Sequence, residues 1–111
     1  MEKGPSTFAQ YWTSEYRLIE HFNKHGPKMG YSNDIDGLIK YARDSIKFAR
    51  SNERGMKTFR AYNGSIYKYI PRTHEFIIIT KDGKIVTYFY PDNPKTFIDN
   101  KFDECGDYWI N

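Results

Sequence analysis

The hydrophobic pattern of this 111-residue chain changes period near residue 55, and this change constrains the fold more than any other feature. Before that point, apolar residues recur three and four positions apart, which is typical of amphipathic helices. After it, apolar residues alternate with polar ones in short runs separated by turn residues, which is typical of antiparallel strands. Helices followed by hairpin-connected strands predict an α+β domain with the helices packed on one face of the sheet.

The first helix is expected over residues 13–25, and a start as early as Ser6 stays open. Apolar and aromatic residues keep helical spacing through this range, with one polar break. Gly26 followed by Pro27 is a strong stop signal, because glycine favours a helix C-terminus and proline does not continue a helix.

A second helix is expected to begin after a cap at Ser32 or Asn33, which leaves Asp34 in its positively polarised first turn. The helix ends before Gly55. Its buried stripe is predicted to consist of Ile35, Leu38, Ile39, Ala42, Ile46 and Ala49.

The second half of the chain predicts four strands that follow one another as a meander. Asn63-Gly64 is the strongest hairpin signal, because a tight turn there requires positive φ at both central residues. The strands are expected over residues 57–62, 65–70, 75–80 and 85–90. After Pro94 the pattern weakens to a possible helical turn at Phe97, with residues 108–110 as an edge strand or as a segment docked on the core.

The expected architecture is two or three N-terminal helices on one face of a four- to five-stranded antiparallel meander sheet. Residues 1–111 form one domain, since this length supports a single core. Its helical part covers about residues 6–52, its meander 56–91 and its C-terminal segment 92–111. The chain is expected to be either a complete small protein or one domain of a longer polypeptide.

Composition narrows the functional classes. Seventeen Lys and Arg against 14 Asp and Glu give a net charge of +3, which permits an acidic partner such as nucleic acid. Inhibitors of basic nucleases tend to be acidic, so this charge disfavours an immunity or antitoxin protein. The single cysteine, Cys105, excludes an internal disulfide and a cysteine-rich zinc site. No apolar run is long enough for a membrane span.

The end of the first predicted helix carries the main candidate chemistry. Lys24 and His25 stand side by side before the Gly-Pro stop. A neutral imidazole can accept a proton near pH 7 and return it, and an ammonium group can hold an anion. His21 lies one turn earlier on the same helical face, and it is either a capping residue or a substrate contact.

No metal site is predicted from the histidines. The His21–His25 spacing occurs in metalloprotease helices, but those carry a glutamate directly after the first histidine, and Phe22 stands there. His74 falls in a predicted turn where exposed polar residues are normal, and we assign it no role.

The last predicted strand has two alternating faces, with Ile85, Thr87 and Phe89 together on one of them. A threonine hydroxyl beside an aromatic ring suits a phosphate oxygen and a stacked base, although strand propensity alone also explains both residues. A second set either forms a basic aromatic surface for RNA or covers a solvent-facing side of the sheet. It consists of Arg60, Tyr62, Tyr67, Lys68 and Tyr69.

These signals occur in the same order in one known group of proteins. Residues 22–26 read Phe-Asn-Lys-His-Gly, residues 29–31 read Met-Gly-Tyr, and residues 85–89 read Ile-Val-Thr-Tyr-Phe. From about residue 19 to residue 91, this pattern resembles the colicin D-type tRNases of the barnase, EndoU, colicin and RelE-like superfamily. Members of that superfamily often form the C-terminal toxin domain of contact-dependent growth inhibition proteins and related interbacterial effectors.

The resemblance implies a function and partners. It implies a metal-independent RNA endonuclease that needs no cofactor and cleaves tRNA through its 2′-hydroxyl, leaving a 2′,3′-cyclic phosphate. It implies a tRNA or other RNA substrate, a cognate immunity protein, and a larger delivery protein upstream. The domain would be the C-terminal part of a secreted or cell-surface effector and would act in the cytoplasm of the target cell.

The resemblance also assigns site residues. His25, Lys24 and Thr87 correspond to the catalytic histidine, its neighbouring lysine and a hydroxyl-bearing strand residue, and Phe89 to an aromatic that contacts substrate. The family pattern can carry a second lysine where this chain has Phe22. A replacement cation would have to come from His21, Lys28 or Arg60, and Tyr67 and Lys68 would add further substrate contacts.

A noncatalytic RNA- or protein-binding module of similar fold is the alternative interpretation, in which the aromatic sheet surface performs the function. The two interpretations differ in what they require of His25. Catalysis requires the imidazole at the end of the first helix to face the strand carrying Thr87 across an open, positively charged groove.

Overall fold

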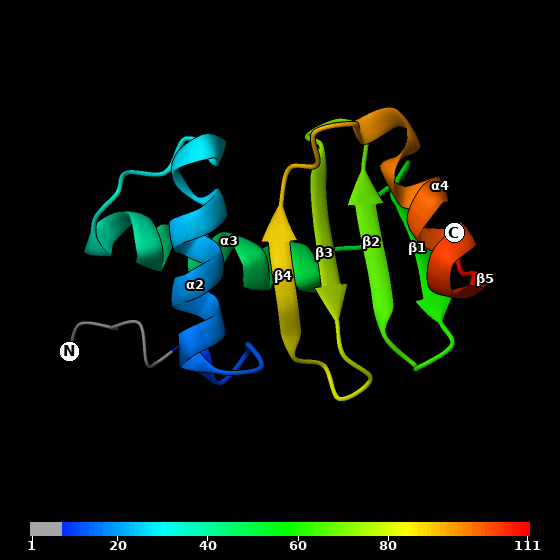
Figure 1. The fold of residues 1–111 in the computed structure, drawn as a ribbon, viewed down its shortest axis with the longest axis horizontal. Coiled ribbons are helices and arrows are strands. Elements are labelled where there is room, and N and C mark those ends of the chain that lie inside the picture. Colours follow the sequence, from blue (N-terminus) through cyan, green and yellow to red (C-terminus); the bar gives the residue numbers. More distant parts are fainter. Residues whose placement is uncertain (1–7) are drawn as a thin grey trace.

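The structure, a computed structural model, describes residues 8–111, and Ser6 lies outside this range. Within it, no helix is long and apolar enough to cross a membrane. The elements follow one another as α2 Glu15–His25, the 3₁₀ turn η1 Pro27–Met29, α3 Ile35–Arg50, β1 Lys57–Ala61, β2 Ile66–Ile70, β3 Glu75–Ile79, β4 Ile85–Phe89, α4 Pro94–Cys105 and β5 Gly106–Trp109 (Figure 1).

The strands form one antiparallel sheet in the order β4-β3-β2-β1-β5. This arrangement confirms the predicted α+β fold and its meander of four consecutive strands. The predicted hairpin turn forms at Asn63-Gly64, where the Gly64 amide donates to the Ala61 carbonyl oxygen (2.9 Å). The expectation of positive φ at both residues is wrong, because Gly64 has a φ of +90° and Asn63 does not have positive φ. The C-terminal segment adds the fifth strand by pairing with β1 at the sheet edge.

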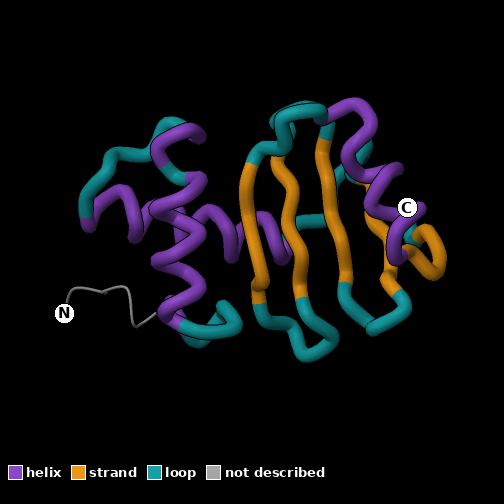
Figure 2. The backbone as a smooth tube through the Cα atoms, in the orientation of Figure 1, coloured by secondary structure: helices purple, strands orange, loops and turns teal. Residues whose placement is uncertain are grey.

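The helices cover the sheet on both faces. α3 crosses behind the sheet, and α4 lies in front of it over β1 and β2 (Figure 1). α4 has 12 residues, where the sequence indicated only a helical turn. Its Ile98 is 1% exposed and packs in a second core with Phe59 and Phe76. The loops gather at the two ends of the strands (Figure 2).

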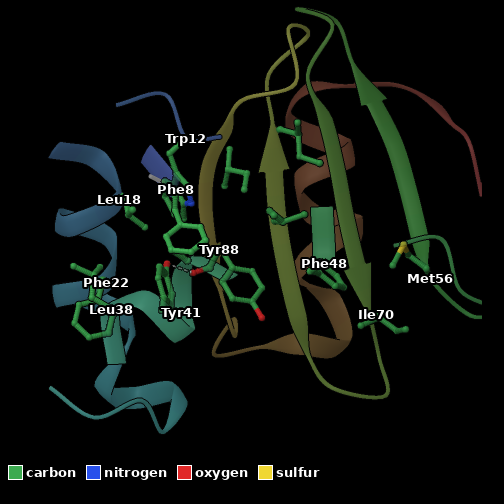
Figure 3. Packing of buried hydrophobic residues seen from close by; sticks show 14 residues of the cluster. Phe8, Trp12, Leu18, Phe22, Leu38, Tyr41, Phe48, Met56, Ile70 and Tyr88 are labelled. Atoms are coloured by element: carbon green, nitrogen blue, oxygen red, sulfur yellow. Dashed lines mark hydrogen bonds between the residues drawn. The ribbon is translucent and has the colours of Figure 1, made fainter. Parts of the chain in front are cut away.

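The main core lies between the sheet and the N-terminal helices and is built on large aromatic side chains (Figure 3). Trp12, Tyr41 and Tyr88 are each at most 1% exposed. Their polar atoms are satisfied inside the core, since the Trp12 indole N–H donates to Ser45 Oγ (3.0 Å) and the Tyr41 hydroxyl donates to the Tyr88 carbonyl oxygen (2.6 Å). These hydrogen bonds tie α3 to the chain before α2 and to β4.

The start and the buried face of α3 differ from the prediction. Asp34, not Ser32 or Asn33, is the N-cap, and its carboxylate accepts from the Gly37 amide (2.9 Å). Ile35 is 56% exposed, while the fully buried stripe includes Tyr41 and Ser45. The predicted stripe contained only apolar residues. Tyr41 and Ser45 can be buried as well, because each hydroxyl has a hydrogen-bond partner inside the protein.

A β-bulge in β4 changes which side chains share a face. Ile79 pairs with Ile85 and Ile78 pairs with Thr87, so Val86 is an extra residue opposite the β3 ladder. Ile85 therefore belongs to the helix-side core, and the prediction that it shares a face with Thr87 and Phe89 is wrong. Thr87 and Phe89 themselves pair with Ile78 and Phe76 and face the other side of the sheet.

Candidate active site

The site forms where α2 runs alongside β4 at the edge of the sheet (Figure 1). Just before α2, Trp12 makes a parallel bridge to Ile85, and the Thr13 amide donates to the Ile85 carbonyl oxygen (3.0 Å). The helix and the strand thus start together and run in the same direction. Successive turns of α2 consequently meet Thr87 first and Phe89 second.

His25 occupies the last turn of α2 and lies flat against the Phe89 ring. The two ring centroids are 4.6 Å apart and the planes differ by 15°. The helix ends directly after His25, because Gly26 takes the cap position and Pro27 starts η1. The Gly26 amide still donates to the Phe22 carbonyl oxygen (2.7 Å), which fixes the chain where the histidine emerges.

A cleft of about 570 Å³ opens beside the His25 ring. Its walls come from the end of α2, from η1, from the connection between β4 and α4, and from the turn between β2 and β3. The lining side chains are Lys24, His25, Lys28, Met29, His74, Phe89, Tyr90, Pro91, Asp92 and Pro94. Two lysines outweigh one aspartate in this set, so the cleft favours an anion.

The surroundings of His25 keep its imidazole neutral. Burial lowers the pKa of His25 to about 4, and the nearby His21, Lys24 and Lys28 act in the same direction, while Asp92 opposes them. A histidine with this pKa has a free lone pair at neutral pH and can accept a proton. The arrangement is therefore suited to a base, since the ring also borders an open cleft.

His21 lies one turn before His25 and contacts the strand residue Thr87. Its Nδ1 and the Thr87 Oγ1 share a hydrogen bond of 2.9 Å. Burial lowers the pKa of His21, with Glu20 opposing and Arg17 adding to the effect. Thr87 is only 7% exposed, and neither residue lines the cleft. The pair lies deeper than His25, whose ring centroid is 5.8 Å from that of His21.

No metal centre surrounds these histidines in the described part of the chain. Among residues 8–111, no group of three or more His, Cys, Asp or Glu side chains could hold a metal ion. Cys105 is a free thiol at the end of α4, and its Sγ donates to the Lys101 carbonyl oxygen (3.4 Å).

The structure brings four predicted site residues together at the cleft: Lys24, His25, Lys28 and Phe89. It also explains the missing lysine at position 22, because Phe22 is 4% exposed and packs edge-on against Tyr41 in the main core. A cation could not stay charged there without a large desolvation cost. Of the three candidate replacement cations, Lys28 lines the cleft, and His21 and Arg60 do not.

Arg60 and Lys68 lie away from the cleft. Both strands place them on the face opposite Phe59 and Tyr67, and Lys68 Nζ donates to the carbonyl oxygens of Ala49 (2.8 Å) and Ser51 (3.0 Å). The guanidinium of Arg60 donates to the hydroxyl of Tyr108 on β5 (3.4 Å), and Arg60 itself is on β1, three strands from β4. That separation is about 14 Å at the usual strand spacing.

Tyr67 is on the same face as Thr87, two strands away, but does not border the cleft. It pairs with Ile78, which pairs with Thr87, and its ring stacks on Phe59 with centroids 4.6 Å apart. Tyr67 thus contributes to the second core and is not in reach of His25 without a substrate that extends across the sheet.

His74 was not predicted to have a role, yet it lines the same cleft as His25. Sequence signals identified its turn and its exposure correctly. Its location follows from strand register, because Phe76 pairs with Phe89 and the residues beyond them lie side by side at one end of the sheet. The signal that could have located His74 is the antiparallel pairing of the third and fourth predicted strands, which places the residues before Phe76 next to those after Phe89.

Comparisons with known proteins bear on the fold. No protein-family model matches the sequence, and no curated protein matches it. Among solved structures, the chain is similar to one chain of a complex described as a ribonuclease from Escherichia coli with its inhibitor protein. The TM-score is 0.54 and the sequence identity is 23%, over 74% of this chain and 95% of that chain. This chain therefore shares its overall fold with a chain of a bacterial ribonuclease–inhibitor complex.

Proposed function

We propose that this protein is a metal-independent RNA endonuclease, a tRNase toxin of the colicin D type. The observation that carries the proposal is His25 itself: a neutral imidazole, stacked on Phe89 and flanked by Lys24 and Lys28, at the wall of an open cleft. The fold shared with a chain of a ribonuclease–inhibitor complex supports it. The residue pattern that resembles colicin D-type tRNases is the second support.

The cleft would bind the RNA backbone through its cations. Lys24 and Lys28 are exposed and border the cleft, so both ammonium groups can approach a phosphate without first breaking a protein contact. Phe89 holds the His25 ring and leaves part of its own face for a base, since it is only half-buried. Aromatic stacking is worth about 1–3 kcal/mol per base and tolerates any sequence.

The proposed reaction is transesterification within the RNA chain. His25 removes the proton from a ribose 2′-hydroxyl, the 2′-oxygen attacks the adjacent phosphorus, and the bond from phosphorus to the 5′-oxygen breaks. Lys24 and Lys28 stabilise the negative charge that grows on the phosphate oxygens. The products are a 2′,3′-cyclic phosphate and a 5′-hydroxyl end.

Thr87 would act from one layer deeper. Its hydroxyl is held by His21 and is largely buried, so it reaches a phosphate only if the RNA enters the space beside α2. In the proposed site, His21 fixes the direction of the Thr87 hydroxyl, and the hydroxyl contributes a hydrogen bond to a phosphate oxygen.

The toxin assignment adds partners. The similar ribonuclease complex contains an inhibitor protein, and we propose that this chain likewise has a cognate immunity protein that covers the basic cleft. We further propose that it is the C-terminal domain of a larger secreted or cell-surface effector and acts in the cytoplasm of a target cell. An immunity protein that fits this site presents acidic groups to Lys24 and Lys28.

The direct test is cleavage of total tRNA by the purified chain in excess chelator, with the new ends identified chemically. We expect discrete fragments with 2′,3′-cyclic phosphate ends. Replacing His25 with alanine is expected to slow cleavage by about 10²–10⁴-fold, the usual contribution of a general base. Asn23→Ala serves as the matched control, since Asn23 is an exposed neighbour in the same helical turn and does not line the cleft.

The outcomes separate the candidate functions. Cleavage that persists in His25→Ala contradicts the assignment of the base, and cleavage that appears only with added metal contradicts the mechanism. If neither the wild type nor any variant cleaves RNA but His25→Ala still binds it, the protein is a noncatalytic RNA-binding module.

A further inference from the structure

The turn between β2 and β3 brings a second histidine to the cleft, in a backbone conformation that demands an explanation. His74 has a φ of +66°, and among residues 8–111 it is the one non-glycine residue with positive φ. The left-handed region costs an ordinary L-residue about 1–2 kcal/mol, and glycine or asparagine usually occupies it. Strained residues of this kind are found at functional sites more often than elsewhere.

Packing does not account for the histidine. Its backbone amide donates to the Ile70 carbonyl oxygen (2.9 Å), which closes the turn and would do so with any side chain. Its imidazole is exposed, and it makes no hydrogen bond, ion pair or ring contact with other described residues. The side chain is therefore available to a molecule in the cleft.

Other charged and polar groups line the cleft together with His74. They are His25 and Lys24 at the end of α2, Lys28 on η1, and Tyr90 and Asp92 on the connection from β4 to α4. The two histidines thus come from different walls of one cleft. This arrangement suits in-line displacement at phosphorus, where the attacking and leaving oxygens lie on opposite sides.

The proposed reaction needs such a second group. Burial lowers the pKa of His25, so its neutral imidazole can accept the 2′-hydroxyl proton on the attacking side of phosphorus. The 5′-oxygen leaves on the opposite side, where His25 cannot reach it. A 5′-alkoxide is a poor leaving group unless it is protonated as its bond to phosphorus breaks. The two lysines are already assigned to the negative charge on the phosphate oxygens.

We propose that His74 is the general acid of this site, the catalytic residue that donates a proton to the departing 5′-oxygen of RNA. This inference rests on the proposed ribonuclease function and completes it. One proton passes from the 2′-hydroxyl to His25 and another from His74 to the 5′-oxygen, while the bond from the 2′-oxygen to phosphorus forms and the bond to the 5′-oxygen breaks. Solvent then returns both histidines to their starting states.

The test uses His74→Asn and His74→Gly, two residues that accept the left-handed backbone and carry no titrating side chain. Single-turnover cleavage of total tRNA is measured from pH 5 to pH 9. We expect both variants to lose about 10²–10⁴-fold in rate with unchanged tRNA binding. Catalysis by a general acid predicts that the wild-type rate falls at high pH and that this fall disappears in both variants. Added imidazole should restore part of the rate of His74→Gly alone.

Arg72→Gln is the matched control in the same turn, since Arg72 is exposed and pairs with Glu53 away from the cleft. A His74→Asn rate close to wild type overturns the inference. A reduced rate with an unchanged pH profile and no imidazole rescue also overturns it, because a structural role would produce that result. In both cases, a large loss in His25→Ala keeps the ribonuclease proposal intact. Absence of cleavage by the wild type ends both.

Discussion

The positive charges beside His25 act differently in the free protein and in the proposed complex with RNA. In the free protein, burial and then the neighbouring His21, Lys24 and Lys28 lower the pKa of His25 to about 4. A phosphate bound between the lysines offsets their charge, so the pKa of the histidine rises when RNA is present. In the proposed reaction, His25 would thereby become a stronger base once RNA occupies the cleft.

The pH dependence of cleavage tests this behaviour. Protonated His25 is inactive as a base, so the rate falls as pH falls through its pKa. We expect the acid limb of kcat/KM, which reports the free enzyme, near pH 4 and the acid limb of kcat at higher pH. The two profiles are measured on tRNA, with circular dichroism at each pH to show that the fold persists. If the acid limbs of kcat/KM and kcat fell at the same pH, the proposal that the two lysines lower the pKa of His25 only in the absence of RNA would be contradicted.

The hydrogen bond between His21 and Thr87 predicts that the two residues act as a pair. Thr87→Val removes the hydroxyl at nearly constant shape and should lower kcat/KM by roughly tenfold, about 1.4 kcal/mol. Thr87→Ser should retain most activity. His21→Phe should cost a similar amount, and the double variant no more than either single one, because both changes remove the same interaction. If the losses in kcat/KM of the two single variants added up in the double variant, His21 and Thr87 would act independently and not as a pair.

At the scale of elements, the entry to α3 depends on a close backbone contact. A Cβ added to Gly37 would lie 1.7 Å from the Ser32 carbonyl oxygen, and backbone cannot yield as a flexible side chain does. Helix propensity alone favours Gly→Ala by about 1 kcal/mol. We expect Gly37→Ala to lower the free energy of unfolding instead, as measured in urea. Lys40→Ala, at an exposed position of the same helix, should change it by less than about 0.5 kcal/mol.

Element prediction succeeded where local chemistry decides the outcome. The Gly26-Pro27 stop and the Asn63-Gly64 turn each depend on neighbouring residues, and the sequence located both. It failed for α4, where Ile98 is the one fully buried side chain and polar residues occupy most other positions, so no amphipathic period stands out. The bulge at Val86 was also unpredictable, because it is defined by how β3 pairs with β4.

At the scale of the whole molecule, the net charge is only +3, but two lysines, Lys24 and Lys28, lie together in the cleft. Each lysine that contacts a phosphate releases counterions, so RNA affinity falls with salt. In the His25→Ala background, which prevents cleavage, Lys28→Gln should reduce the slope of log K against log[salt] by about 0.7–0.9. Lys81→Gln, on the turn at the other end of the sheet, should leave the slope unchanged.

The candidate site was predicted where its residues are close in sequence. Lys24, His25 and Lys28 follow from one helix end, and a hydroxyl and an aromatic two residues apart indicated Thr87 and Phe89. His74 joins them only through the folded sheet, which brings the turn after β2 to the end of β4. Arg60 and Lys68 were predicted from their charge to contact RNA, and this prediction ignored the face of the sheet on which they lie. Strand alternation places both on the face opposite Phe59 and Tyr67, away from the cleft.

The bulge in β4 has a consequence for how such a protein can vary over evolution. Val86 is one residue more than the β3 ladder requires, and only this surplus lets Ile85 enter the helix-side core while Thr87 and Phe89 meet α2. Removing a single codon there would reverse the two faces of the strand end. Among descendants that keep the cleft beside His25, we therefore expect free substitution at position 86 and strict preservation of the number of residues between Ile79 and Thr87.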